Sequence, residues 1–198
     1  MKLYYTPGAC SLAPHIVIRE VGLAAELVRV DLRAKTLEDG SDYLAINEKG
    51  AVPALGLDAD EVLTENAAIL QYLADLSGSD TLLPGSGIRR YRVLEWMIYV
   101  TTELHKGYAP LWNPASADEL KDSTRALLAK KFDFVEGRLG ESEYLTGTDF
   151  TLADAYLYVM LRWAEMHRVE IGNGLAAYRD RVAARPGVAK ALEEEGLS

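Results

Sequence analysis

The sequence predicts a small α/β domain followed by an all-helical domain. Strand and helix signals alternate in the first part of the chain, whereas the periodic segments after it all have helical spacing. Between the two parts, residues 77–87 are rich in turn-forming residues and carry little periodicity, which indicates a linker. We therefore expect a first domain over residues 1–78, a linker over 79–87 and a helical domain over 88–198.

The first domain is expected to contain strands and helices in the order β-α-β, a variable segment, then β-β-α. Apolar or β-branched runs predict the strands, at Lys2–Thr6, Leu27–Asp31, Ala54–Leu57 and Val62–Thr64. Helical spacing predicts the helices, at Ser11–Val21 and Glu65–Ser77, with Ser11 as a possible cap. This order predicts a right-handed parallel crossover at the start and a hairpin through Asp58-Ala59-Asp60 at the end.

The second domain is expected to be helical throughout. Ile88–Trp112 is long and amphipathic, with one predicted face made of Tyr91, Leu94, Ile98, Thr101 and Leu104. Thr151 and Asp154 have the spacing of a capping box that opens a helix ending near His167. Further helices are expected at Leu120–Leu139, Gly174–Ala184 and Pro186–Glu194.

Composition and charge argue against several classes of protein. Hydrophobic residues make up 49% and charged residues 26% of the 198 residues, which is ordinary for a soluble globular protein. We expect neither a membrane span nor a secretory leader, because no apolar run has the required length and flanks. The net charge of −9 argues against non-specific nucleic-acid binding. A single cysteine cannot form an internal disulfide, so a cytoplasmic location is the simplest expectation.

Cys10 is the candidate reactive residue because it lies where a predicted strand turns into a helix. The turn is predicted at Pro7-Gly8-Ala9. A thiol at the start of a helix meets unpaired N–H groups and the positive end of the helix dipole, and both favour the thiolate. The competing interpretation is that Cys10 is a small buried hydrophobic residue. No spacing among the three histidines and the cysteine suggests a metal site.

Several short motifs in a fixed order resemble those of one family, the cytosolic glutathione S-transferases, and in particular its bacterial, cysteine-bearing Beta class. Together they span essentially the whole chain. They are Met1-Lys2-Leu3-Tyr4-Tyr5, Pro7-Gly8-Ala9-Cys10-Ser11-Leu12, Asn47-Glu48-Lys49-Gly50, Val52-Pro53-Ala54-Leu55, Leu63-Thr64-Glu65, Glu103-Leu104-His105-Lys106 and Phe150-Thr151-Leu152-Ala153-Asp154-Ala155. The resemblance implies a thioredoxin-like N-terminal domain plus an all-α C-terminal domain. It also implies glutathione as co-substrate, no metal, and a homodimer that acts in detoxification.

The resemblance also implies a glutathione site near Cys10. Val52–Pro53 would be a cis bond, and the Val52 backbone would pair with the cysteinyl part of glutathione. Glu65 would receive the γ-glutamyl ammonium, and Asn66, at the start of a helix, would receive the carboxylate. The family often has Ser or Gly where this chain has Asn66. Without the resemblance, an ordinary helix start with an acidic first turn is the favoured interpretation of Glu65 and Asn66.

Charged residues farther from Cys10 complete the implied glutathione site. Lys35 would pair with the glycyl carboxylate, although a loop lysine is normally only solvated. His105 would stabilise the thiolate or accept its proton, and Lys106 would lie near it at the glycyl end. Glu103 is expected to reach across the dimer interface to the γ-glutamyl ammonium. Ile98 occupies a position where the family often carries an Asn that approaches glutathione, so we expect that contact to be missing.

The acceptor-substrate pocket would lie between the domains and take a small hydrophobic electrophile or a disulfide. Its apolar wall is expected from aromatic residues, Tyr108, Trp112, Tyr156 and Trp163, although aromatic residues at helical spacing also fit a core. Cys10 would form a mixed disulfide, giving thiol-disulfide or peroxide activity, or would only stabilise the glutathione thiolate. The alternatives are a non-catalytic binding protein of the same fold and a narrow glutathione-dependent dehalogenase or isomerase.

Overall fold

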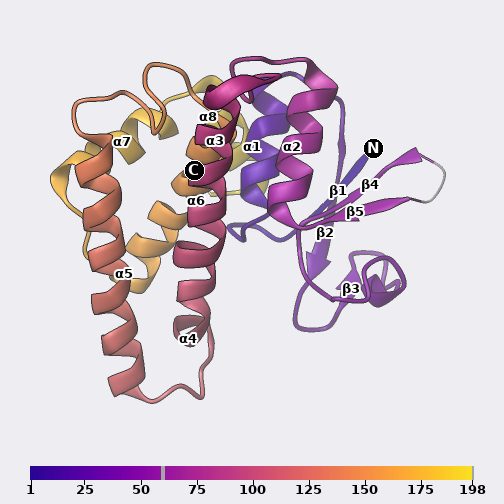
Figure 1. Cartoon of the computed structure of the whole chain (residues 1–198). Helices are drawn as coiled ribbons and strands as arrows, with labels where there is room; N and C mark the ends of the chain where they lie inside the picture. Colours follow the sequence, from indigo (N-terminus) through magenta and orange to yellow (C-terminus); the bar gives the residue numbers. More distant parts are fainter. Residues whose placement is uncertain (59–60, 198) are drawn as a thin grey trace. The chain divides into compact units, whose positions relative to one another are not determined.

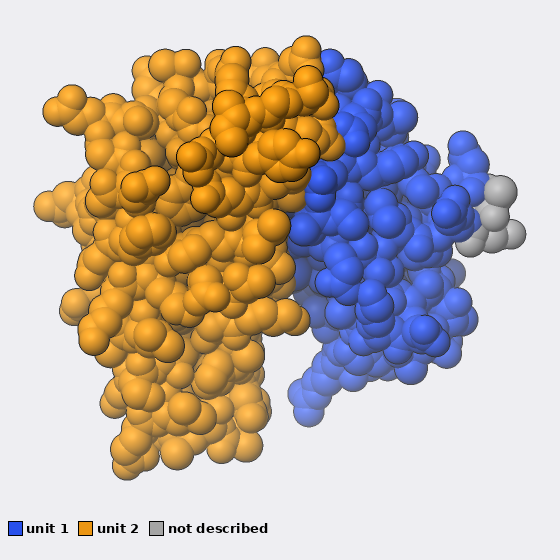
Figure 2. Space-filling view, viewed as in Figure 1, with its two compact units in different colours: residues 1–79, 184–198 blue, residues 80–183 orange. Residues whose placement is uncertain are grey.

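The chain forms two compact units in a computed structural model that describes residues 1–58 and 61–197. Unit 1 contains residues 1–79 and 184–198, and unit 2 contains residues 80–183 (Figure 2). The helical domain was predicted to run to residue 198, but the last helix packs with the N-terminal unit. No helix among the described residues is both long and apolar enough to cross a membrane.

The sheet of unit 1 has the strand order β3-β2-β1-β4-β5 (Figure 1). Strands β1 and β2 are parallel and are joined by the first helix, which confirms the predicted crossover, whereas β4 is antiparallel to β1 and β5 is antiparallel to β4. The elements of this unit are β1 (Lys2–Tyr5), α1 (Leu12–Glu20), β2 (Glu26–Asp31), β3 (Thr36–Leu37), β4 (Ala54–Gly56), β5 (Val62–Thr64), α2 (Asn66–Ser77) and α8 (Pro186–Glu195). Each predicted strand and helix of the first domain is therefore present within a residue or two of its expected ends.

The variable segment of the prediction holds two short elements that sequence patterns did not indicate. Strand β3 pairs with β2, with Leu37 opposite Val30, and a single 3-10 turn follows at Tyr43–Ala45. Neither is long enough to show a period. In the predicted hairpin turn, residues 59 and 60 lie outside the described residues, and the Leu57 N–H donates to the Glu61 carbonyl at 2.8 Å.

Helix α8 joins unit 1 because it packs closely on α1. Its buried face includes Val188, Ala191 and Leu192. Gly187 allows the close approach, since a Cβ atom there would lie 2.7 Å from the Glu20 backbone nitrogen. The predicted helix at Pro186–Glu194 is thus confirmed, and its apolar face packs on α1 of the first unit.

Unit 2 is built around α6, whose side chains are buried along most of its length. Its helices are α3 (Gly87–Tyr99), α4 (Ala109–Trp112), α5 (Asp118–Leu139), α6 (Leu152–His167) and α7 (Asn173–Ala183). Between α3 and α4 the chain forms a π-helical segment at Val100–His105 and a 3-10 turn at Lys106–Tyr108. The single helix predicted over Ile88–Trp112 is therefore interrupted in the middle.

The buried face of α3 differs from the predicted one. Val93, Met97 and Val100 are buried, whereas Tyr91 is 64% and Ile98 is 58% exposed. The helix carries two apolar stripes, and sequence periodicity alone does not tell which one packs against α6. The exposed stripe leaves an apolar surface on unit 2.

Candidate active site

The turn before α1 fixes the position of Cys10. The Ala9 N–H donates to the Thr6 carbonyl at 3.0 Å, which closes the turn. Ser11 was expected to cap the helix, but its hydroxyl points back along the chain. It accepts the Thr6 N–H at 3.2 Å and donates to the Thr6 carbonyl at 3.3 Å. Ser11 therefore holds the turn and makes no side-chain cap.

Cys10 is 8% exposed and its thiol faces the Val52 backbone. The Sγ atom donates to the Val52 carbonyl oxygen at 3.2 Å. The Val52–Pro53 bond is cis, as the resemblance implied. This places the only cysteine of the chain against the loop that was expected to bind glutathione.

Asn66 links the start of α2 to Cys10. Its Nδ2 donates to the Cys10 carbonyl at 2.9 Å, and the side chain is almost fully buried. Its Oδ1 is buried and accepts no hydrogen bond from any described residue. The Asn66 side chain thus holds the backbone of Cys10, while the first N–H groups of α2, which were expected to receive the carboxylate, have no partner within the helix.

Glu65 and Lys35 adopt the left-handed backbone conformation that side chains rarely take. Their φ angles are 73° and 61°. Such residues cost about 1–3 kcal/mol each and concentrate at functional sites. The Glu65 carboxylate is exposed and accepts from Lys49 Nζ at 2.7 Å, and Lys35 Nζ donates to the Gly50 carbonyl at 2.7 Å. Lys49 lies in the Asn47-Glu48-Lys49-Gly50 motif, and the sequence predicted no role for it.

The remaining candidates belong to unit 2, and Glu103 lies in its π-helical segment. Lys131 on α5 donates to the Glu103 carboxylate at 2.9 Å and to the Glu103 carbonyl at 2.8 Å. The hydrogen bond from Lys131 lowers the pKa of Glu103. Sequence reasoning missed Lys131, because nothing in its helix distinguishes it from the neighbouring Lys130.

His105 ends the same segment and is held by aromatic residues. Its Nδ1 makes a short hydrogen bond with the Tyr156 hydroxyl, and its ring meets Trp163 edge to face at 5.2 Å between centroids. Lys106, the next residue, is exposed. Glu103, His105 and Lys106 therefore lie together at the end of the π-helical segment and the start of the 3-10 turn.

The aromatic residues predicted to line a substrate pocket form one cluster with His105 and His167. Trp163 packs edge to face on both Tyr108 and Trp112. Tyr108 and Tyr156 are fully buried, and the Tyr108 hydroxyl donates to the Met160 carbonyl. These two are core residues of unit 2 in this structure, whereas Trp112 is 47% exposed.

His167 closes the other end of this cluster. Its ring meets Trp112 edge to face at 4.4 Å between centroids. Burial, with a smaller contribution from Arg125, lowers its pKa. Its Nε2 is buried and has no hydrogen-bond partner among the described residues. We assign it no catalytic role.

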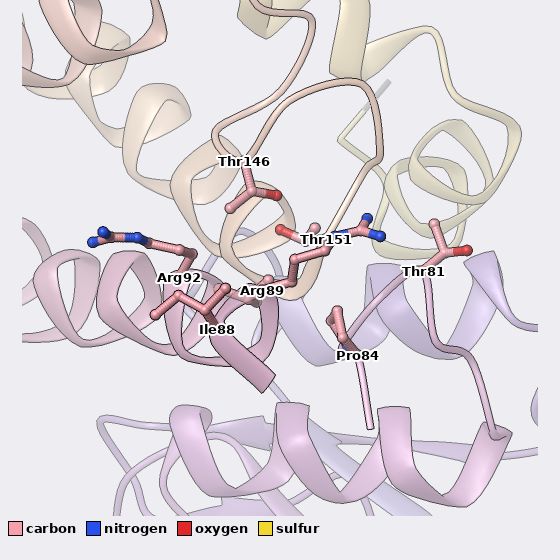
Figure 3. A pocket seen from close by; sticks show the side chains of 8 residues that line it. Thr81, Pro84, Ile88, Arg89, Arg92, Thr146 and Thr151 are labelled. Atoms are coloured by element: carbon pink, nitrogen blue, oxygen red, sulfur yellow. The ribbon is translucent and has the colours of Figure 1, made fainter. Parts of the chain in front are cut away.

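Hollows also occur among the described residues, one in each unit. One, of about 150 Å³ in unit 2, is shown in Figure 3, where Arg89 and Arg92 extend to opposite sides. It contains none of the predicted site residues; its lining is Thr81, Pro84, Ile88, Arg89, Arg92, Val93, Thr146 and Thr151. The other, of about 470 Å³ in unit 1, lies along β2 and β3 and reaches the Cys10 turn at Thr6. Sequence patterns indicated neither hollow.

Comparison with family models matches both units. Residues 1–75 match the glutathione S-transferase N-terminal domain, and residues 99–186 match the glutathione S-transferase C-terminal domain. The chain is similar to glutathione S-transferase GstA of Escherichia coli O157:H7, at 48% identity over 200 residues that cover all of both chains. It is also similar to glutathione S-transferase GST-4.5 of Xanthomonas campestris, at 40% identity over the full length of both.

Solved structures give the same result. The ternary complex of BphK, a bacterial glutathione S-transferase, has a TM-score of 0.95 and 44% identity over the full length of both chains. A sphingomonad glutathione S-transferase complexed with glutathione has a TM-score of 0.93 and 42% identity, also over both full lengths. A bacterial beta-class enzyme from Sphingomonas chungbukensis has the same two values and the same coverage.

Proposed function

This chain belongs to the glutathione S-transferase family and is a glutathione transferase that uses glutathione as co-substrate, and from this premise we propose which of its residues bind and react. Its fold is that of the bacterial beta-class enzymes, a thioredoxin-like unit with a helical unit. The single observation that carries the proposal is the contact between Cys10 Sγ and the Val52 carbonyl at 3.2 Å.

We propose that glutathione lies along the Val52 backbone with its sulfur near Cys10. The Val52 carbonyl has a second lone pair, so it can accept a peptide N–H beside the Cys10 thiol. The buried Asn66 Oδ1 supports a ligand at this point, because a buried acceptor without a partner is rare in proteins. The γ-glutamyl carboxylate would meet the first N–H groups of α2, as anions do at helix starts.

Glu65 and Lys35 would hold the two ends of glutathione. The Glu65 carboxylate is exposed, and an ammonium group would share it with Lys49. Lys35 would exchange its bond to the Gly50 carbonyl for the glycyl carboxylate, a stronger charge-assisted partner. The resemblance also implies His105 and Lys106 as glutathione-site residues, and this role stays a prediction.

Two reactions are proposed at Cys10. In disulfide exchange, the Cys10 thiolate attacks one sulfur of a disulfide, a new S–S bond forms, and the other sulfur leaves as a thiolate. Glutathione thiolate then attacks the mixed disulfide and releases Cys10. In conjugation to a hydrophobic electrophile, glutathione thiolate is the nucleophile, and Cys10 and His105 only stabilise its charge. Trp112 and Trp163 would contact the electrophile.

We propose a two-fold homodimer in the cytoplasm in which Glu103 serves the site of the partner. The exposed apolar stripe on α3, with Ile88, Tyr91 and Ile98 each more than half exposed, supports a symmetric interface. The Glu103 side chain is 46% exposed and remains accessible to a ligand. Light scattering should then report about twice 21.8 kDa.

Replacing Cys10 by alanine separates the two reactions. Cys10→Ala removes the only sulfur of the protein that can form a mixed disulfide, because the four methionines carry thioethers. Activity toward a hydroxyalkyl disulfide should collapse, whereas conjugation to a chlorinated aromatic should fall less. Full disulfide-exchange activity in Cys10→Ala would remove the covalent role. The glutathione-binding proposal would survive that result, because calorimetric binding tests it independently.

A further inference from the structure

A buried carboxylate at the end of the chain contacts the turn that carries Cys10. Glu195, in the last turn of α8, has a side chain with no exposed surface. Its Oε2 accepts the backbone N–H of Gly8 at 2.8 Å. Gly8 is two residues before Cys10 and 187 residues before Glu195, and both lie in unit 1. The last helix thus reaches the same turn that Ser11 and Asn66 hold from other sides.

The Glu195 carboxylate is held in place by a chain of further polar side chains. Its Oε1 lies 2.9 Å from Nδ1 of His15, which is itself fully buried on α1. The other ring nitrogen of His15 lies 2.8 Å from the Glu194 carboxylate, which accepts from Arg19 at 2.6 Å. Although burial raises the pKa of Glu194, the bonds to Arg19 and His15 outweigh it and lower the pKa overall.

The backbone of Gly8 is intrinsically flexible and has to be held by its neighbours. Its φ of 71° lies in the left-handed region, which glycine reaches without steric cost. Glycine also adopts many other conformations in the unfolded chain, so contacts are needed to fix this one. The side chain of Leu197 packs over it, 3.7 Å from where a Cβ atom would be. Glu195 and Leu197 therefore hold Gly8, the first by a hydrogen bond and the second by an apolar contact.

We propose that Glu195 is a positioning residue for Cys10. By accepting the Gly8 N–H through a rigid, buried carboxylate, it fixes the turn and hence the placement of the thiol against Val52. A carboxylate makes a stronger hydrogen bond to an amide than a neutral acceptor does, and His15 keeps it from rotating away. The inference rests on the proposed role of Cys10 in function, although the contact itself does not.

The interface between α1 and α8 offers a matched control for simple destabilisation. At its other end, Arg185 donates to Glu20 from Nη2 at 2.6 Å and from Nε at 3.2 Å. The Glu20 side chain is only 9% exposed. Glu20→Gln therefore weakens the same packing without touching Gly8, His15 or Cys10.

The test measures the alkylation rate of Cys10 by iodoacetamide in the folded protein, well below its melting temperature. The chain has one cysteine, so a single rate is read and no turnover is needed. In Glu195→Ala the freed turn should expose the thiol and raise the rate about fivefold, the factor expected from one lost hydrogen bond of ordinary net strength. Glu20→Gln should lower the melting temperature but leave the rate within about twofold of native. Glu195→Gln keeps an acceptor oxygen but loses the charge, so its rate should lie between those of the native protein and Glu195→Ala.

Activity and exchange measurements separate positioning from folding. Glu195→Ala should lower kcat for disulfide exchange with little change in KM for glutathione, and the native Gly8 amide should be protected from hydrogen exchange. Equal alkylation rates in Glu195→Ala and Glu20→Gln would overturn the inference. An alkylation rate in Glu195→Gln as high as that in Glu195→Ala would also overturn it. If Glu195→Ala does not fold, an unprotected Gly8 amide in the native protein would overturn the inference instead. Faster alkylation in Glu195→Ala together with active Cys10→Ala would keep the positioning role and remove only the covalent one.

Discussion

Asp154 anchors the start of α6, and replacing it by asparagine should destabilise the protein strongly. Its carboxylate is fully buried and accepts four hydrogen bonds. Oδ1 accepts from the Leu145 N–H at 2.8 Å and from the Tyr178 hydroxyl at 2.7 Å. Oδ2 accepts from the Thr151 N–H at 2.8 Å and from the Thr151 hydroxyl at 2.7 Å. All four partners are donors, so the site needs an acceptor on both oxygens.

The cost of Asp154→Asn follows from these four bonds. An amide keeps one oxygen and turns an NH2 group toward the other pair of donors. The hydroxyl of either pair can rotate and accept from it, but the backbone N–H of that pair loses its acceptor. We expect about 2–4 kcal/mol, from one unsatisfied buried N–H and from the loss of charge assistance in the remaining bonds. Burial raises the pKa of Asp154, so the neutral amide also avoids a desolvation cost, which limits the loss.

Urea unfolding measures this loss as a shift in midpoint at constant slope. Asp149→Asn is the matched control, because its carboxylate is exposed and pairs with Arg89 at 3.0 Å. That exposed pair should contribute about 0–1 kcal/mol. If Asp154→Asn cost no more than Asp149→Asn, the reasoning that this carboxylate is required at the start of α6 would be refuted.

Three further predictions concern ligand, charge and packing. Glutathione at about 100 times its Kd should stabilise the folded protein by about 2.7 kcal/mol, which would raise the melting temperature. An unchanged melting temperature, together with no heat of binding in calorimetry, would contradict the proposed site. Lys131→Met should raise the pKa of Glu103 in a carboxylate titration by NMR, whereas Lys130→Met should not. The pKa of Glu103 is lower in the folded than in the unfolded state. The ion pair with Lys131 therefore stabilises the folded protein fully at pH values above the unfolded-state pKa, and this stabilisation is lost as the pH falls through the folded-state pKa. The Glu136 carboxylate caps the start of α7 by accepting the Gly174 N–H at 2.6 Å. In Gly172→Ala the new Cβ would lie 1.7 Å from Glu136 Oε2 and displace this cap, which should cost about 1–2 kcal/mol in urea unfolding. The same cost in a Glu136→Ala background would contradict this mechanism.

The sequence predicted most of the fold because its elements carry local signals. The strands of the first domain are apolar runs between turn residues, and the capping box at Thr151 is local in sequence. The boundary of the second domain was wrong at its end, because helical periodicity shows that α8 has an apolar face but not what that face covers. The π-helical segment at Val100–His105 was missed because the extra residue per turn extends over only six residues and leaves no recognisable period in the sequence.

The candidate site could be predicted only for residues that stand in recognisable sequence motifs. Cys10 and the cis Val52–Pro53 bond belong to motifs whose order resembled a family. Glu195 and Lys131 are single charged residues on ordinary helices, and their roles come from contacts with residues 187 and 28 positions away. Contacts of this range depend on how the elements pack, and one sequence without an alignment carries no record of them.

Unit 1 is built from both ends of the chain, so the turn that carries Cys10 can be completed only late in synthesis. Residues 1–79 leave the ribosome first, but α8 and the carboxylate that holds Gly8 come from residues 184–198. At translation rates of about 5–20 residues per second, the nascent first unit waits on the order of ten seconds with the receiving face of α1 uncovered. Unit 2 is continuous in sequence and can form in that interval. Nascent or truncated chains that lack α8 therefore expose apolar surface of α1, and the turn is fully held only after α8 has been made.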